Sequence, residues 1–426
     1  MSAATRVRAD DGPMAGTGSV VPRFAPGNRA LGPVRLQQLV LIEVAAALVL
    51  AAGAVDRMLL LAAVVPAVVL VLLAVFRRGS RPMVEWLTSA VALRRRERRA
   101  APAPAGSDPR LAPVVECEPA LRTDSFTDRG GRTVGLVGDG TFLSAVLQVE
   151  AVDRPLRPHR VEKALPLALL RDAMDVDGIR LESVQVVQSA LPAPAPHLSA
   201  QALAARNYAP LQELTGSPAV RLTWVALKFD PQLCPEAVEA RGGGADGARR
   251  CLLRAADQLA SRLQGAGFTA TLLSEDGLTT ALTTAGNVNP AATAQAGRTG
   301  SVARRTQEGP RAWRCDDRWH TTYWVGRWPR LGEGAVPLPE LAALLTSLPA
   351  LSTTLSLTLG RGRVLEGRHV PTMAGHVRIC GRSSDELDAV RRELERSARA
   401  VKVALVRLDH EQVPGVLATL PLGGTR

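Results

Sequence analysis

The stretch "RWHTTYWVGRWPR", residues Arg318–Arg330, is rich in aromatic and β-branched residues, a composition typical of a β-strand. The segment "PELAALLTSL" at 339–348 predicts a helix. A second helix follows Ser383, which stands with Glu386 in capping-box spacing. Further strands are predicted at residues 351–359, 375–381 and 401–408. The last third of the chain therefore has the element order strand, helix, strand, strand, helix, strand.

This order is the βαβ-βαβ plan of ferredoxin-like units, and it predicts an α+β fold with an antiparallel or mixed sheet and helices on one face. Upstream, residues 132–151 form two alternating runs around Gly138-Asp139-Gly140, which predicts a hairpin. More strands are predicted at residues 179–188, 219–230 and 268–273. The segment Thr284–Arg311 is rich in Gly, Ala and Thr without a sustained period, so we expect a long mobile loop there and a possible boundary inside a 114–426 domain.

The composition shows what builds the core and argues against two kinds of site, a zinc site and a disulfide framework. The 426 residues carry a formal net charge of +12, almost entirely from arginine, and aromatic residues make up only 3%. The core must therefore be built from Leu, Val and Ala. Five dispersed cysteines without a CxxC motif or a Cys/His cluster indicate neither a zinc site nor a disulfide framework.

Two apolar runs near the N-terminus, at residues 36–55 and 58–76, each approach the length that crosses a bilayer as a helix. Only Asp56 and Arg57 separate them, so we expect a transmembrane hairpin within residues 35–78. Arginines flank both ends, which predicts an inner-membrane protein with both termini cytoplasmic and a disordered cytoplasmic tail at 1–34. A cleaved signal peptide and a buried hairpin in a soluble core are the alternatives. The second run lacks the polar face that a soluble hairpin requires.

Residues 79–113 predict a basic amphipathic helix followed by a linker. Apolar residues recur at helical spacing from Met83 to Leu93, and arginines cluster at the end. Because this helix adjoins a membrane span, we expect it to lie on anionic lipid rather than on nucleic acid. The predicted membrane-interface residues are Trp86, Arg94, Arg95, Arg96, Arg98 and Arg99.

The segment "EARGGGADGARRCLL" (Glu239–Leu253) contains Gly242, Gly244 and Gly247 in dinucleotide-binding spacing. A phosphate site of this kind requires a strand that ends at the first glycine, whereas the predicted strand ends near Asp230. No lysine completes a P-loop. A turn entering a helix near Ala245 is therefore favoured. The alternative is a membrane-anchored enzyme that uses a nucleotide or sugar nucleotide.

Most of the tryptophans lie close together in the sequence, with a histidine and a tyrosine among them, which predicts either a packing centre or a partner surface. This group consists of Trp313, Trp319, His320, Tyr323, Trp324 and Trp328. No GxSxG, HExxH or paired-carboxylate motif accompanies them, so no catalytic residue, cofactor or metal is predicted.

Taken together, the chain resembles the EccE family of the type VII (ESX) secretion machinery of actinobacteria. The resemblance rests on the two adjacent spans, Glu85-Trp86-Leu87, and a series of segments in order. These segments are "VGLVGDGTFLSAVLQV", "ESVQVVQSALPAP", "ARGGGADGARRCLL", "WHTTYWVGRWP" and "EQVPGVLATLPLGG". The resemblance implies a non-enzymatic structural subunit of an inner-membrane secretion complex. Such a subunit is a peripheral scaffold that works with EccB, EccC and EccD components and needs no cofactor.

Overall fold

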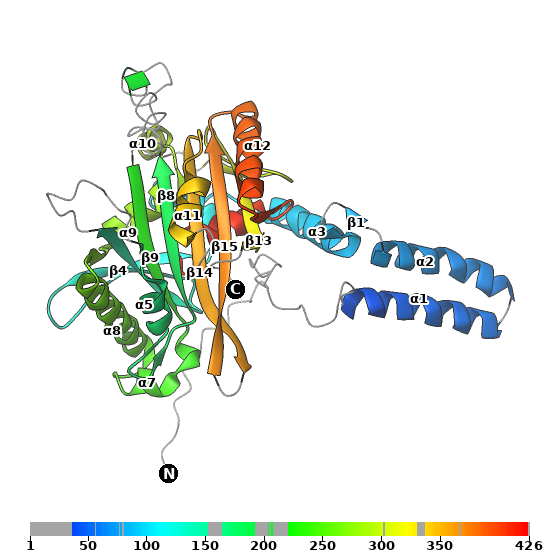
Figure 1. Cartoon of the computed structure of the whole chain (residues 1–426), viewed down its shortest axis with the longest axis horizontal. Helices are drawn as coiled ribbons and strands as arrows, with labels where there is room; N and C mark the ends of the chain where they lie inside the picture. Colours follow the sequence, from blue (N-terminus) through cyan, green and yellow to red (C-terminus); the bar gives the residue numbers. More distant parts are fainter. Residues whose placement is uncertain are drawn as a thin grey trace, which may run out of the picture.

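The structure of the chain, a computed structural model, consists of a sheet domain with a helical hairpin that points away from it (Figure 1). It describes residues 36–55, 57–75, 77–78, 81–151, 164–191, 203, 206–207, 220–300, 303–329, 337–365 and 368–424. The predicted tail at 1–34 lies outside these residues.

A twelve-stranded sheet forms the centre of the domain, in the order β11-β12-β13-β15-β14-β8-β9-β5-β4-β3, with β10 beside β5 and β16 beside β13. Every pairing within it is antiparallel. The strands are β3 (Arg122–Thr127), β4 (Thr133–Gly138), β5 (Leu143–Ala151), β8 (Ser183–Leu191), β9 (Val220–Phe229), β10 (Phe268–Leu272), β11 (Thr306–Glu308), β12 (Trp313–Cys315), β13 (Arg318–Arg327), β14 (Ser352–Leu365), β15 (Arg368–Gly381) and β16 (Ala404–Arg407). The predicted α+β class is confirmed, with an antiparallel rather than a mixed sheet.

The βαββαβ order predicted for the last third is present, and it occurs twice. In the second half the order is β13, α11 (Leu338–Thr346), β14, β15, α12 (Ser384–Ala400), β16, with β13 between β15 and β16. In the first half it is β5, α5 (Leu167–Asp172), β8, β9, α8 (Gly244–Gly265), β10, with β5 between β9 and β10. An antiparallel pair, β8 with β14, joins the halves into one sheet.

The two halves are related by an approximate two-fold axis that passes through the Val187–Ser356 pair of β8 and β14. Backbone conformation matches as well. The β4–β5 and β12–β13 turns hold Gly140 (φ 92°) and Asp316 (φ 55°) at the same place. The turns after α8 and α12 likewise hold Gly267 (φ 82°) and Lys402 (φ 59°). The domain therefore uses one plan twice, with different residues in the corresponding positions.

Helices cover both faces of the sheet, so the expectation of helices on one face is wrong. One hydrophobic cluster packs α5, α8, α11 and α12 through residues such as Leu170, Leu259 and Leu394. The second cluster packs α4 (Ala112–Cys117), α9 (Glu275–Gly286) and α13 (Gln412–Ala418) through residues that include Leu278 and Val416. Strand side chains alternate between the two clusters, so the sheet is a middle layer.

The predicted loop at Thr284–Arg311 is also wrong, because the segment contains the end of α9, the helix α10 (Pro290–Thr299) and β11. Asn289 caps α10: its side chain accepts a hydrogen bond from the Ala291 backbone N–H at 2.9 Å, and proline occupies the first turn. None of the residues of α10 is buried. A helix without a buried face has no apolar periodicity, which explains why the sequence pattern did not indicate it.

Two buried arginines of the second half hold the C-terminal end of α9. Arg318 donates to the carbonyl of Asn287 at 2.7 Å, and Arg378 donates to the carbonyl of Ala285. The partial negative charge of a helix C-terminus favours cations there. Burial lowers the pKa of Arg378 to about 10, which leaves it charged at neutral pH. This helix of the first half is thus anchored on strands of the second.

The last helix of the second half makes the reciprocal crossing. After α13, residues 419–424 form a buried segment across β5, β8 and β9, which we call the C-terminal strap. Ser144 donates to the Leu422 carbonyl at 2.7 Å and Ser183 to the Gly423 carbonyl at 2.6 Å. Gln185 donates to Ala418 and accepts from the Gly423 N–H. Each half therefore contributes a segment that packs on the strands of the other half.

The helices α1 (Leu36–Val55) and α2 (Arg57–Val75) coincide with the two predicted spans and pack side by side (Figure 1). Their described side chains are those of residues 40, 42–54 and 63–72. Within the described part of the chain, no helix combines the length and apolarity needed to cross a membrane. The two spans remain a prediction.

Candidate functional site

The buried carboxylate of Glu308 is the centre of the candidate site. The basic helix α3 (Met83–Arg99) brings Arg96 to it, with Nε 2.8 Å and Nη2 3.0 Å from the two carboxylate oxygens. The Glu308 side chain is 3% exposed, against 27% for Arg96. The same carboxylate accepts the Val413 N–H at 2.9 Å, in the first turn of α13. One acid thus joins the basic helix to both β11 and α13.

Further contacts hold the inner face of α3. The ring of Trp86 meets His410 edge-on, with centroids 5.4 Å apart. Ser89 donates to Glu411 at 3.2 Å, and Leu93 is buried. We call this set the α3 docking site, formed by Trp86, Ser89, Leu93 and Arg96 against Glu308, His410 and Glu411. Its residues on the domain lie on β11 and on the turn between β16 and α13.

The predicted membrane-interface residues divide between the two faces of α3. Trp86 and Arg96 contact the domain, whereas Arg94, Arg95, Arg98 and Arg99 are exposed. Leu87 and Val91 are exposed on the same helix. Contact of these exposed residues with lipid remains a prediction.

A second buried glutamate fastens the chain just beyond the linker. Glu116 of α4 accepts hydrogen bonds from the N–H of Arg305 at 3.0 Å and from the N–H of Thr306 at 2.8 Å. It also accepts from the Thr306 hydroxyl at 2.7 Å. The chain segments on both sides of the linker, α3 and α4, are therefore attached to the same short strand.

The glycine segment forms a turn between two helices. After β9 the chain passes through a 3-10 turn (Pro231–Leu233) and α7 (Pro235–Glu239) before α8 begins at Gly244. A Cβ added to Gly247 would lie 2.5 Å from the Val238 carbonyl oxygen, so close packing of α7 on α8 requires a glycine there. A Cβ on Gly243 would lie 2.9 Å from the Glu239 carboxylate. An acid beside the turn, and no strand leading into Gly242, do not favour a phosphate site.

The predicted aromatic group is divided by β13 rather than gathered in one patch. Trp313 is buried in the second cluster, 4.8 Å from the His320 ring. Tyr323 is buried in the first cluster and donates to Glu395 at 2.8 Å. Trp319 and Trp328 pack partly buried on that same cluster, while Trp324 is half-buried. The burial of this group accords with packing.

The buried histidines of this region titrate outside the usual range. Burial, with Arg378 and Arg318 nearby, holds the pKa of His320 well below 6.5. Burial alone lowers the pKa of His376 to about 4. His320 Nε2 lies 3.7 Å from the sulfur of Cys380, whose pKa burial raises to about 11. Neutral imidazole and protonated thiol are therefore the forms present at neutral pH, and this cluster carries no poised nucleophile.

The fold and the site define an α+β domain whose position beside a pair of helices is fixed by a docked basic helix. Residues 217–325 match the family model "Putative type VII ESX secretion system translocon, EccE". This part of the chain is thus similar to the EccE family, which the description names as a component of the type VII secretion translocon. No curated protein matches the chain significantly. The match runs from β9 into β13, across the junction between the two halves.

Sequence reasoning did not identify the residues on the domain side of the α3 docking site. Glu308, His410 and Glu411 lie more than two hundred residues from α3 along the chain, in short or irregular segments. The sequence carries no clear signal for them, because Glu308 stands in a strand of only three residues, Thr306–Glu308, within a segment interpreted as a loop.

Proposed function

We propose that this protein is a non-enzymatic peripheral scaffold of the type VII translocon, in which α3 links a membrane hairpin to the α+β domain. The observation that supports it is the Glu308 carboxylate, which binds Arg96 in two hydrogen bonds while accepting from the first turn of α13. A bidentate pair with a buried carboxylate fixes the direction of α3 on the domain.

The side chains of the hairpin support its place in a membrane. Leu50 is 74% exposed, Val65 67% and Leu72 54%, and such an apolar surface marks contact with lipid or with other helices. Small residues are buried within the hairpin, among them Ala45 and Ala67. The exposed faces remain available for the helices of EccB-, EccC- or EccD-type partners.

The outer face of α3 supports contact with anionic lipid. Leu87 and Val91 present an apolar stripe, and the exposed arginines Arg94, Arg95 and Arg98 follow it toward the end of the helix. An amphipathic helix of this composition lies in the headgroup region when it adjoins a membrane-embedded segment.

Affinity purification of the full chain from detergent-solubilised membranes tests the scaffold. We expect it to co-migrate with the other translocon subunits in native mass analysis, and a chain that always migrates as a free monomer would contradict the proposal. Arg96→Gln should reduce co-purification, whereas Arg95→Gln, which removes the same charge from the exposed face, should not.

A reporter fused after Arg426 tests the membrane orientation. The charge distribution beside the hairpin predicts a cytoplasmic reporter. Fusion beyond the strap is necessary because Gly423 and Gly424 are buried. Export of the reporter would contradict the predicted orientation of both termini.

A further inference from the structure

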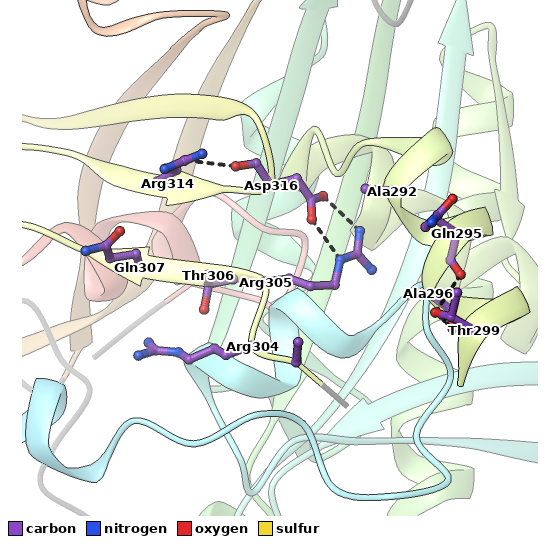
Figure 2. A pocket seen from close by; sticks show the side chains of 11 residues that line it. Ala292, Gln295, Ala296, Thr299, Arg304, Arg305, Thr306, Gln307, Arg314 and Asp316 are labelled. Carbon is purple, nitrogen blue, oxygen red and sulfur yellow. Dashed lines mark hydrogen bonds and ion pairs between the residues drawn. The ribbon is translucent and has the colours of Figure 1, made fainter. Parts of the chain in front are cut away.

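An open cavity of about 910 Å³ lies between α10, the segment that leads into β11, and β12 (Figure 2). Three arginines and a single aspartate line it, together with glutamine, threonine and alanine side chains, and no aromatic residue is among the lining. The cavity therefore has excess positive charge and hydrogen-bonding groups.

One of the three arginines belongs to the wall. Arg305 donates to both carboxylate oxygens of Asp316 at 2.8 Å, to the Pro109 carbonyl at 2.6 Å and to the Thr293 hydroxyl at 2.9 Å. Its donors and its charge are thus satisfied within the protein. The excess charge of the cavity resides on Arg304 and Arg314.

These two arginines are oriented but not neutralised. Arg314 donates through Nε to the Asp316 carbonyl at 2.9 Å and lies 5.6 Å from the centre of the Trp319 ring. Figure 2 shows Arg304 extending away from the Arg305–Asp316 pair. Among the residues that the structure describes, neither guanidinium meets a carboxylate. A guanidinium binds a carboxylate in the bidentate manner that Arg305 already shows here.

The floor and sides of the cavity have the size and the hydrogen-bonding groups to accommodate an extended peptide backbone. Ala292 and Ala296 of α10 leave room for close approach, and the amides of Gln295 and Gln307 supply donors and acceptors on either side. No residue of α10 is buried, so this helix has little packing of its own. A segment bound along α10 would supply apolar and polar contacts that the helix lacks.

We propose that this cavity docks an acidic peptide segment of a partner protein, whose carboxylates bind Arg304 and Arg314. The lining favours a peptide over a nucleotide, because a base has no aromatic side chain to stack upon. It favours a peptide over a membrane, because α10 lies on the part of the domain away from α1 and α2 (Figure 1). This inference goes beyond the proposed scaffold role, which does not depend on the cavity.

The test measures fluorescence anisotropy of a short labelled peptide of alternating glutamate and serine, titrated with the detergent-solubilised full chain. A peptide with glutamine in place of glutamate is the matched probe. We expect Arg304→Gln and Arg314→Gln each to weaken binding about three- to tenfold, and the double variant more. Arg311→Gln, an exposed arginine of the same hairpin outside the cavity, should bind as the unmodified protein does.

Several outcomes would overturn the inference. One is equal binding of the glutamine peptide, and another is a double variant that retains full affinity. Displacement of the peptide by ATP would assign the cavity to a nucleotide, and displacement by phosphatidylglycerol vesicles would assign it to lipid. Retained co-purification with translocon subunits in the double variant would show that the scaffold role survives such a failure.

Discussion

At the scale of single residues, charge in this protein is placed where it joins segments distant in the sequence. Glu308 joins α3 to α13, Glu116 joins α4 to β11, and Arg318 with Arg378 holds the end of α9. Removing one partner of a buried pair leaves the other unsatisfied, which costs more than the net contribution of the pair.

Arg96→Gln should therefore lower the free energy of unfolding by about 1–3 kcal/mol, because Glu308 would stay buried without its cation. The control Arg95→Gln removes an exposed charge and should change it by less than about 0.5 kcal/mol. Urea unfolding of the full chain in detergent measures both. Equal effects of the two substitutions would show that the Arg96–Glu308 pair does not hold α3.

The buried histidines predict a dependence of stability on pH. His376 stays neutral in the folded protein down to about pH 4, whereas an unfolded histidine takes up a proton near pH 6.5. The unfolded state thus binds more protons within this window. The free energy of unfolding should fall as the pH falls through it, by about 1.4 kcal/mol per pH unit for each such histidine.

His376→Leu removes this titration, so the slope of unfolding free energy against pH between about 4.5 and 6 should decrease by about 1.4 kcal/mol per pH unit. Ser356→Ala is the matched control, since Ser356 pairs with His376 across β14 and β15 without titrating. An unchanged slope in His376→Leu would mean that the imidazole gains a proton in the folded state.

At the scale of elements, the C-terminal strap shows how an irregular segment becomes part of the core. Gly423 has a φ of 92°, and a Cβ there would lie 2.4 Å from the Cβ of Lys228. Gly131 has a φ of 77° but nothing within 4 Å of an added Cβ. Both glycines have a positive φ, but only Gly423 is also closely packed, so a comparison of the two distinguishes the cost of backbone conformation from the cost of a steric clash.

Gly131→Ala should cost about 1 kcal/mol through its positive φ alone. Gly423→Ala adds a steric clash with β9, and we expect a loss of about 3 kcal/mol or more. Thermal unfolding of both variants is the measurement. A similar loss of stability in the two variants would show that the C-terminal strap moves to accommodate the added methyl group.

The elements also show what sequence patterns reveal. The β4–β5 hairpin, β9, α8 and the last βαββαβ unit were predictable, because alternation, helical spacing and turn residues are local properties. The strap and α10 were not, since neither has an apolar period. Of the α3 docking site only the helix itself was predicted, and its Trp86 and Arg96 were expected on lipid, whereas they contact the domain. The acid of this site, Glu308, acquires its role through a contact 212 residues away in sequence.

At the scale of the whole molecule, the two halves are interlocked. The β8–β14 pair joins their sheets, α9 of the first half ends on Arg318 and Arg378 of the second, and the strap returns from the second half onto β5 and β8 of the first. The repeat escaped sequence inspection because equivalent positions, such as Gly267 and Lys402, share backbone conformation rather than residue type.

A chain divided between residues 300 and 303 tests this interlocking. We expect fragments 1–301 and 302–426 to co-purify when they are expressed together, and each to aggregate when expressed alone, because each then exposes a long central strand edge. A soluble, folded single fragment would show that the halves are independent domains.

The approximate two-fold axis has a consequence for how the helical hairpin is attached to the domain. In the first half, Thr123 takes the place that Glu308 has in the second, as the paired β3–β4 and β11–β12 hairpins show. The same backbone arrangement thus occurs twice, but only the copy in the second half has a carboxylate that can bind a basic helix. This chain's own α3 occupies that copy, so the duplicated arrangement is attached to the helical hairpin in one orientation only.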